Sequence, residues 1–211
     1  KSPDTRVIVL KSEGERTFCA GASFDELLQI KDKESGTQFF SGFVNVINAC
    51  RKSEKIIIAR VQGKAVGGGV GLAAAADYCI ATEAASVKLS ELAIGIGPFV
   101  ISPAVIRKIG LPAFSQLTIR AADFQTAQWA KEKGLYNEVY ADIPALDEAV
   151  DTLAARLASY HPDALAGLKE ILWEGTEDWD QVLAERAAIS GELVLSEFTQ
   201  QALNNFLTGK R

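Results

Sequence analysis

Two turns built from small residues are the positions of this chain best suited to chemistry. The first turn is FCAGA at residues 18–22, and the second is the cluster Gly67, Gly68 and Gly69 with Gly71. Three successive glycines carry a high entropic cost, so they indicate backbone N–H groups that approach something closely. One N–H from each turn could converge on a carbonyl oxygen as an oxyanion hole, and a single nearby carboxylate would then suffice as proton carrier. Taken alone, the cluster also fits a packing turn between a strand and a helix.

The chain offers few other groups for catalysis or metal binding. It contains one histidine, His161, and three cysteines, Cys19, Cys50 and Cys79. A Ser-His-Asp or Cys-His nucleophile system would have to use His161, which precedes Pro162 and fits the entry to a helix. An odd number of widely spaced cysteines argues against a disulfide framework, and one histidine leaves a zinc site short of ligands. The sequence therefore predicts no metal site.

The glycine cluster also partly matches a dinucleotide-binding turn. Residues 69–74, GVGLAA, fit the G-x-G-x-x-A variant, and Glu91 lies 20 residues beyond Gly71, where such folds place a ribose-binding acid. The helix after the cluster has room for only about two turns, whereas a crossover helix is normally longer. A Walker-type loop is excluded because no Gly-Lys-Ser/Thr follows the glycines. A dinucleotide-binding oxidoreductase remains an alternative.

Length and composition are those of a globular protein with one main core. The chain has 211 residues, of which 48% are hydrophobic and 23% charged, and its net charge is −5. A negative net charge does not favour binding to the phosphate backbone of nucleic acid. The apolar runs are shorter than the ~20 residues that a membrane span needs, and the N-terminal residues lack the pattern of a signal peptide. We therefore expect no membrane or nucleic-acid partner and a cytoplasmic location.

Short strands alternate with helical patterns in the first two thirds of the chain and predict an α/β core. The predicted strands are Arg6–Leu10, Ile56–Ala59, Tyr78–Ala81, Val87–Leu89 and Leu135–Val139. Ser23 and Glu26 fit a capping box for a short helix, which Gly36 is expected to interrupt. Residues Thr37–Cys50 carry a phenylalanine-rich stripe at helical spacing, which is more typical of a core helix than of a cofactor site.

The last part of the chain is predicted to be helical, ending in one long helix at Asp178–Gly209. The preceding helical patterns are Pro103–Ile109, Ala113–Ile119, Thr126–Lys133, Ala145–Tyr160 and Pro162–Glu174. The tail helix carries more apolar residues than an isolated helix needs, namely Val182, Leu183, Ala187, Ile189, Leu193, Leu195, Phe198 and Leu203. Burial against another subunit would explain them, so we expect a homotrimer or a hexamer formed as a dimer of trimers.

Several of these segments together resemble the signature of a known family. They are FCAGA, the ARVQG run that leads to Gly67, the AAAD at residues 74–77, and Ser90-Glu91-Leu92 followed by Gly95 and Pro98. In this order and spacing they resemble the enoyl-CoA hydratase/isomerase (crotonase) family over most of the chain. Residues Ala121–Gly134 are similar to the helix that follows the pocket in that family.

The resemblance implies a fold, a substrate class and a set of site residues. The fold is α/β, a crotonase-like spiral of ββα units at residues 1–140, with a helical C-terminal trimerisation region at residues 141–211. The substrate is an acyl-CoA thioester, with coenzyme A as part of the substrate and no separate cofactor. By position, the N–H groups of Ala22 and Gly68 form the oxyanion hole and Glu91 carries the proton. The other residues placed near the substrate are Ala20, Gly21, Ser23, Gly67, Gly71, Pro98 and Phe99, and Lys210 and Arg211 are placed near the nucleotide of coenzyme A.

The departures from the family pattern bear on the reaction. Family hydratases use two glutamates, and here Gly71 occupies the place of the first. Phe99 follows Pro98 where the family usually has a glycine, Ser23 replaces an aspartate, and the family's first strands precede the point at which this chain begins. With Glu91 alone, a proton shuttle between C2 and C4 of a thioester enolate is simpler than hydration. Isomerisation and hydration both stay open, as does a catalytically inactive acyl-CoA-binding subunit.

Overall fold

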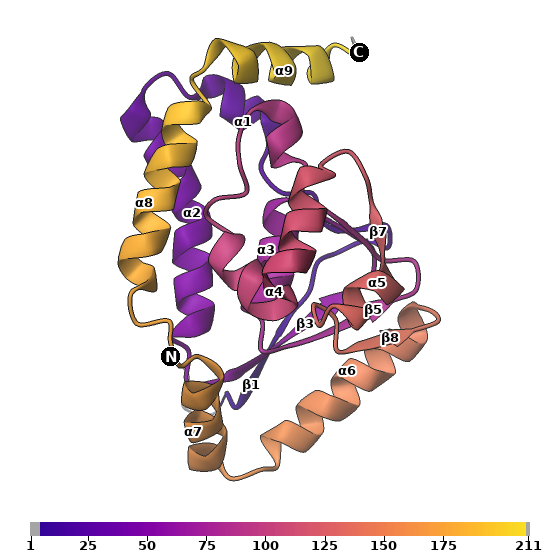
Figure 1. Cartoon of the computed structure of the whole chain (residues 1–211). Helices are drawn as coiled ribbons and strands as arrows, with labels where there is room; N and C mark the ends of the chain where they lie inside the picture. The colour runs from indigo at the N-terminus through magenta and orange to yellow at the C-terminus, as the bar shows by residue number, and fades with distance from the viewer. Residues whose placement is uncertain (1–4, 210–211) are drawn as a thin grey trace.

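The strands of the computed structural model form two four-stranded sheets that the chain visits in turn (Figure 1). The structure describes residues 5–209, so Lys210 and Arg211 lie outside the described part. The first sheet has the order β1-β3-β5-β8 and is parallel throughout, and the second has the order β2-β4-β6-β7, with β7 antiparallel to β6. In chain order the strands are β1 Val7–Leu10, β2 Thr17–Cys19, β3 Ile56–Val61, β4 Lys64–Val66, β5 Tyr78–Thr82, β6 Ser86–Lys88, β7 Gln125–Thr126 and β8 Glu138–Tyr140.

A strand of each sheet followed by a helix makes one ββα unit, and the repetition of this unit is the predicted spiral. The helices are α1 Phe24–Gln29, α2 Lys33–Arg51, α3 Gly68–Ala75, the 3₁₀ helix η1 Glu91–Ile94, α4 Ser102–Ile119, α5 Ala127–Glu132, α6 Ile143–Ala158, α7 Pro162–Leu172, α8 Trp179–Leu193 and α9 Glu197–Leu207. After β8, every described element is helical. Within residues 5–209, none of these helices combines the length and apolar character needed to cross a membrane.

Strand β3 is buried along its whole length because both of its faces are covered. Successive side chains of a strand point to opposite faces. Ile57, Ala59 and Val61 accordingly belong to the main core, while Ile58 packs with Leu146 and Val150 of α6 on the other face. The continuous apolar run of this strand is the pattern expected of a parallel strand covered on both sides.

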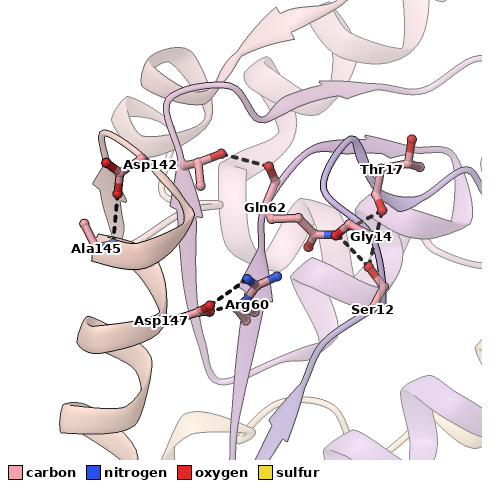
Figure 2. Close-up of polar contacts among 9 residues, drawn as sticks. Ser12, Gly14, Thr17, Arg60, Gln62, Asp142, Ala145 and Asp147 are labelled. Atoms are coloured by element: carbon pink, nitrogen blue, oxygen red, sulfur yellow. Dashed lines mark hydrogen bonds and ion pairs between the residues drawn. The ribbon is translucent and has the colours of Figure 1, made fainter.

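Polar contacts at the end of β3 hold the loop between β1 and β2 in place (Figure 2). The buried side-chain amide of Gln62 donates to Ser12 Oγ at 2.9 Å and to the carbonyl oxygens of Gly14 and Thr17 at 3.0 Å each. These bonds tie the β3–β4 connection to the loop between β1 and β2. The ARVQG segment thus fixes the strand that leads into FCAGA.

Two sequence predictions about the helices were wrong. Gly36 does not interrupt a helix but lies inside α2, because α1 already ends at Gln29 and Asp32 caps a new helix through the backbone N–H of Ser35. A β-carbon added to Gly36 would lie 2.5 Å from the carbonyl oxygen of Gly191 on α8. The glycine is therefore needed where α2 and α8 cross closely, a tertiary reason that the local pattern does not contain.

The tail is two helices rather than one. Helix α8 ends at Leu193, and Ser196 caps α9 by accepting a hydrogen bond from the N–H of Thr199. Figure 1 shows α8 lying along α2 and α9 crossing above α1. Part of the apolar tail is therefore buried within the chain, at Leu183, Ala187, Val194 and Leu203, whereas Ile189 and Phe198 remain exposed. The trimer or hexamer stays a prediction, as does the division at residue 140.

A buried carboxylate anchors the turn between α3 and β5. Asp77 accepts hydrogen bonds from the N–H of Ile57 at 2.8 Å, from Lys169 Nζ at 2.6 and 2.8 Å and from Trp173 Nε1 at 2.7 Å. The side chains of Asp77 and Lys169 are 2% and 3% exposed. Helix α7 is thereby fixed to the end of α3, the helix that begins in the glycine cluster.

Removal of one partner of this ion pair is expected to destabilise the fold strongly. Lys169→Ala would leave the Asp77 carboxylate buried without its counter-charge, which typically costs about 3–5 kcal/mol. Urea denaturation at pH 7 measures the loss in the free energy of unfolding. The exposed Lys133 is the matched control, and Lys133→Ala should change this free energy by less than about 0.5 kcal/mol. A loss at Lys169 as small as that of the control would contradict the anchoring role.

Candidate active site

All three predicted catalytic segments follow the carboxyl ends of neighbouring strands in the second sheet. Residues 20–22 follow β2, the glycine cluster follows β4, and Glu91 follows β6. Strand β4 lies between β2 and β6 and is parallel to both, with Cys19 opposite Ala65 and Val66 opposite Lys88. The carboxyl ends of parallel strands share one edge of a sheet, which is where such folds gather their functional groups. The topology thus brings together segments that are far apart in the sequence.

The FCAGA turn lies directly against the start of α3. Gly21 has a φ of +86°, a backbone conformation that favours glycine. A β-carbon at this position would lie 2.9 Å from the carbonyl oxygen of Val66 and 3.3 Å from the backbone nitrogen of Gly68. The residue before Ala22 therefore touches the predicted second oxyanion donor. The two turns therefore lie side by side, while the convergence of their N–H groups on one oxygen stays a prediction.

Each glycine at the start of α3 faces a different close neighbour. A β-carbon on Gly67, whose φ is +54°, would lie 2.8 Å from Oε1 of Glu91. On Gly68 it would lie 2.1 Å from the ring of Phe43, and on Gly69 it would lie 2.3 Å from the carbonyl oxygen of Cys19. The bare backbone therefore admits a carboxylate, an aromatic ring and the first turn. The packing turn considered from the sequence explains the contact between Gly69 and Cys19. It does not explain why Gly67 faces the Glu91 carboxylate.

The Glu91 carboxylate is held at the glycine turn in an apolar environment. Glu91 is the first residue of η1, and its backbone oxygen accepts a hydrogen bond from the N–H of Ile96. Its Oε2 atom is inaccessible to solvent and has no hydrogen-bond partner within residues 5–209. Desolvation raises the pKa of Glu91 to about 7. Near neutral pH the group can therefore both accept and donate a proton, as a proton carrier must.

This raised pKa predicts that Glu91 destabilises the fold at alkaline pH. The folded chain binds the proton more tightly than the unfolded chain, so the stabilising contribution is complete below about pH 4.5 and is lost as pH rises through about 7. The ionised carboxylate then costs on the order of 3 kcal/mol. Glu91→Gln, which stays neutral, should therefore be more stable than the wild type at pH 8 by about that amount. Urea denaturation at pH 5 and pH 8 tests this, and the same difference at both values would contradict it.

A small apolar cavity of about 60 Å³ joins these elements. Eight of the ten predicted site residues line it, namely Ala20, Gly21, Ala22, Gly67, Gly68, Glu91, Pro98 and Phe99. The other two lie outside the lining. Ser23 caps α1 by accepting a hydrogen bond from the N–H of Glu26 at 3.4 Å, and Gly71 packs against Ile101.

Comparison with known proteins gives this arrangement a family. The family model described as enoyl-CoA hydratase/isomerase matches residues 1–207. The chain belongs to the enoyl-CoA hydratase/isomerase family. It is 31% identical over 215 aligned residues to a carnitinyl-CoA dehydratase of Escherichia coli strain SMS-3-5, covering 92% of this chain and 80% of the relative. The match to the carnitinyl-CoA dehydratase of Escherichia coli strain K12 is 34% identical and covers 80% of this chain and 64% of the relative, which is less than two thirds of its length.

Solved structures of the family share the crotonase fold of this chain. An enoyl-CoA hydratase from Mycobacterium avium is 27% identical with a TM-score of 0.87, and the match covers 99% of this chain and 79% of that structure. An enoyl-CoA hydratase from Bacillus anthracis is 29% identical with a TM-score of 0.76, and the match covers 100% of this chain and 81% of that structure. Membership of this family removes the dinucleotide-binding alternative.

Apolar atoms surround Gly71, the position to which the resemblance assigns the first glutamate of the family hydratases. A β-carbon on Gly71 would lie 2.3 Å from Cγ2 of Ile101, so a hydrocarbon side chain occupies the surroundings of Gly71. Of the residues that line the cavity, Glu91 is the single one with a titratable side chain. Within residues 5–209, no second carboxylate lines the cavity.

Several residues of the cavity were missed by the sequence analysis. Phe40 and Phe43 of α2 line it although their helical spacing predicted core packing, and Ser190 reaches it from α8. The other missed residues are Phe24, Leu27, Ser90, Ile94, Ile96, Gly97, Val100 and Ile101. The phenylalanine stripe therefore both packs in the core and lines the cavity. Among the missed residues, those in the segment 94–100, IGIGPFV, carry a sequence signal, because its two glycines and proline are typical of irregular backbone.

A larger groove of about 900 Å³ adjoins the cavity. The two share the lining residues Ala20, Ala22, Phe24, Ser90 and Ile94. Lys88 and Phe124 line the groove on the sheet side, and the ammonium of Lys88 lies 4.8 Å from the centre of the Phe124 ring. The site therefore offers a small apolar chamber beside a larger groove, whose lining includes one basic residue, Lys88, and one acidic residue, Asp25.

Proposed function

We propose that this chain processes acyl-CoA thioesters by a proton transfer at C2, with Glu91 as the proton carrier. The observation that carries the proposal is the Glu91 carboxylate beside the glycine turn, whose Oε2 atom is buried and has no hydrogen-bond partner within residues 5–209. The N–H groups of Ala22 and Gly68 would stabilise the enolate oxygen. As the first residue of α3, Gly68 has no carbonyl within its own helix to receive its N–H, so this donor is free for a ligand.

In this proposal the acyl group occupies the cavity and the rest of the thioester lies in the groove. Ala20, Gly21 and Gly67 would contact the reacting carbons from the two turns, with Pro98 and Phe99 on the facing loop. The groove meets the cavity at Ala20 and Ala22. It therefore suits a long substituent that extends from the cavity into the groove. Coenzyme A enters as part of the substrate, and no further cofactor is proposed.

Movement of a double bond is the outcome that one carboxylate supports best. Glu91 removes a proton from C2 of a 3-enoyl thioester, and the electron pair left on C2 delocalises onto the thioester oxygen. The protonated Glu91 then returns that proton to C4, so the double bond moves from C3–C4 to C2–C3. Each proton removed is returned, and neither a bound water nor a second acid is required.

Elimination of water is the second candidate, favoured by the carnitinyl-CoA dehydratase and enoyl-CoA hydratase relatives. From a 3-hydroxyacyl thioester, Glu91 would take the proton from C2 and pass it to the hydroxyl that leaves C3 as water. The reverse step would add water to a 2-enoyl thioester. The space at Gly71, filled by Ile101, offers no second carboxylate for activating that water.

A panel of four-carbon 2-enoyl-, 3-enoyl- and 3-hydroxyacyl-CoA thioesters tests the proposal. Mass spectrometry in H₂¹⁸O separates double-bond movement, which incorporates no oxygen, from hydration, which incorporates one. We expect conversion of the 3-enoyl to the 2-enoyl thioester without incorporation. Incorporation at the same or a higher rate would establish the second candidate. Binding of all three thioesters without turnover would overturn the catalytic proposal in favour of an acyl-CoA-binding subunit.

A further inference from the structure

Ile101 closes the catalytic cavity on the side of α3. Its side chain packs on the bare backbone of Gly71, where a β-carbon would lie 2.3 Å from Cγ2 of Ile101. Ile101 is 4% exposed and lines the cavity together with Phe99, whose ring covers Gly97. Gly71, the position to which the resemblance assigns a glutamate, is thus covered by a side chain of the apolar wall in this chain.

The segment that carries this wall is held in place by polar contacts. Ser102, which is 6% exposed, donates from Oγ to the carbonyl oxygen of Phe99 at 2.5 Å. Arg186 of α8 in turn donates from its guanidinium to Ser102 Oγ. The backbone on both sides of Ile101 is therefore tied to α8, so the wall cannot retreat easily to admit a longer ligand.

The size of the cavity sets a limit on the acyl group. A cavity of ~150 Å³ holds benzene, which has six carbons. On that scale the 60 Å³ available here hold about two or three carbons. With the thioester carbonyl at the two turns, C2, C3 and C4 of an acyl group would fill the space.

We propose that Ile101, supported by Phe99, restricts this site to acyl groups of about four carbons. The proposal rests on the proposed function, since it takes an acyl-CoA thioester as the ligand. In this proposal Ile101 determines specificity, and the substrates are thioesters of short, unbranched acyl groups. A long fatty acyl group and the bulky quaternary ammonium of a carnitinyl group would both exceed the cavity.

The test measures both turnover and binding across chain length. Initial rates with 3-enoyl-CoA thioesters of four, six, eight and ten carbons give kcat/KM, and calorimetry with the saturated acyl-CoA thioesters of the same lengths gives Kd without turnover. A methylene that fits or fails to fit an apolar pocket changes kcat/KM by about 10–200-fold. We therefore expect kcat/KM and affinity to fall at least about tenfold from four to eight carbons. Carnitinyl-CoA should bind as weakly as the eight-carbon thioester.

Ile101→Ala should move the preference to six carbons, because it removes three carbons from the wall. Ile109→Ala is the matched control, since Ile109 is buried in α4, the helix that follows Ile101 directly, but does not line the cavity. The control should keep the four-carbon preference. If Ile101→Ala does not fold, Ile101→Val and the wild-type profile still decide the question.

The outcomes separate this inference from the proposed function. Equal kcat/KM and Kd for four and eight carbons in the wild type would overturn the inference and leave the proposed function standing. A four-carbon preference in Kd without turnover of any thioester would support the inference and overturn the catalysis. Absence of binding to every thioester would overturn both.

Discussion

Glu91→Gln is expected to lower kcat by about 10²–10⁴ because general acid–base catalysis by one positioned side chain is worth that much. Glutamine keeps the shape of the side chain, so the cavity beside Gly67 is preserved while the proton carrier is lost. The rate with a 3-enoyl-CoA thioester gives kcat, and calorimetry shows whether the variant still binds acyl-CoA. We expect binding to change by much less than turnover.

The exposed Glu83 supplies the matched control for this change. Glu83→Gln lies on the loop between β5 and β6, away from the residues that line the cavity, and should leave kcat unchanged. Turnover by Glu91→Gln within threefold of the wild type would remove Glu91 from the mechanism.

The pH profile of the wild type gives an independent check on Glu91. Proton removal from C2 needs the ionised carboxylate, and desolvation raises the pKa of Glu91 to about 7. Below that pH, kcat/KM should fall about tenfold for each pH unit, and above it the rate should level off. Glu91→Gln should lose this dependence. A profile that is flat between pH 5 and pH 8 would contradict the assignment.

The two turns could be predicted from the sequence because their signals are local, whereas Glu91 was singled out by its place in the family pattern. Successive glycines and the small residues of FCAGA restrict the backbone wherever they occur. The ββα alternation could be predicted as well, since short apolar runs and helical spacing follow each other along the chain. The resemblance to the family then joined the segments in the order that the parallel strands β2, β4 and β6 require.

The rest of the site depends on contacts between distant segments, which single-sequence patterns do not record. Phe43 reaches Gly68 only because α2 packs along α3, and Ile101 meets Gly71 only because α4 begins beside that helix. Gly36 was misread for the same reason, since its neighbour Gly191 is 155 positions away in the sequence. A glycine that serves close packing and a glycine that breaks a helix look the same in the sequence.

Removal of the Gly68 N–H is the direct test of the oxyanion hole, and the position permits it. Gly68 is the first residue of α3, where proline is tolerated because no intrahelical hydrogen bond is lost. A β-carbon there would meet the ring of Phe43 at 2.1 Å, so the test needs a background in which that ring is removed. Phe43→Ala supplies this background for two further variants, Gly68→Ala and Gly68→Pro.

These two double variants differ mainly in one hydrogen-bond donor. Both carry a β-carbon at residue 68, but the N–H remains in Gly68→Ala and is absent in Gly68→Pro. Loss of one oxyanion donor typically lowers kcat by about 10²–10³, so we expect that ratio between them. The loss should fall on kcat rather than KM, because the bond forms fully only to the enolate oxygen. Comparable thermal unfolding would show that α3 is intact in both, and rates within threefold of each other would exclude the Gly68 N–H as a donor.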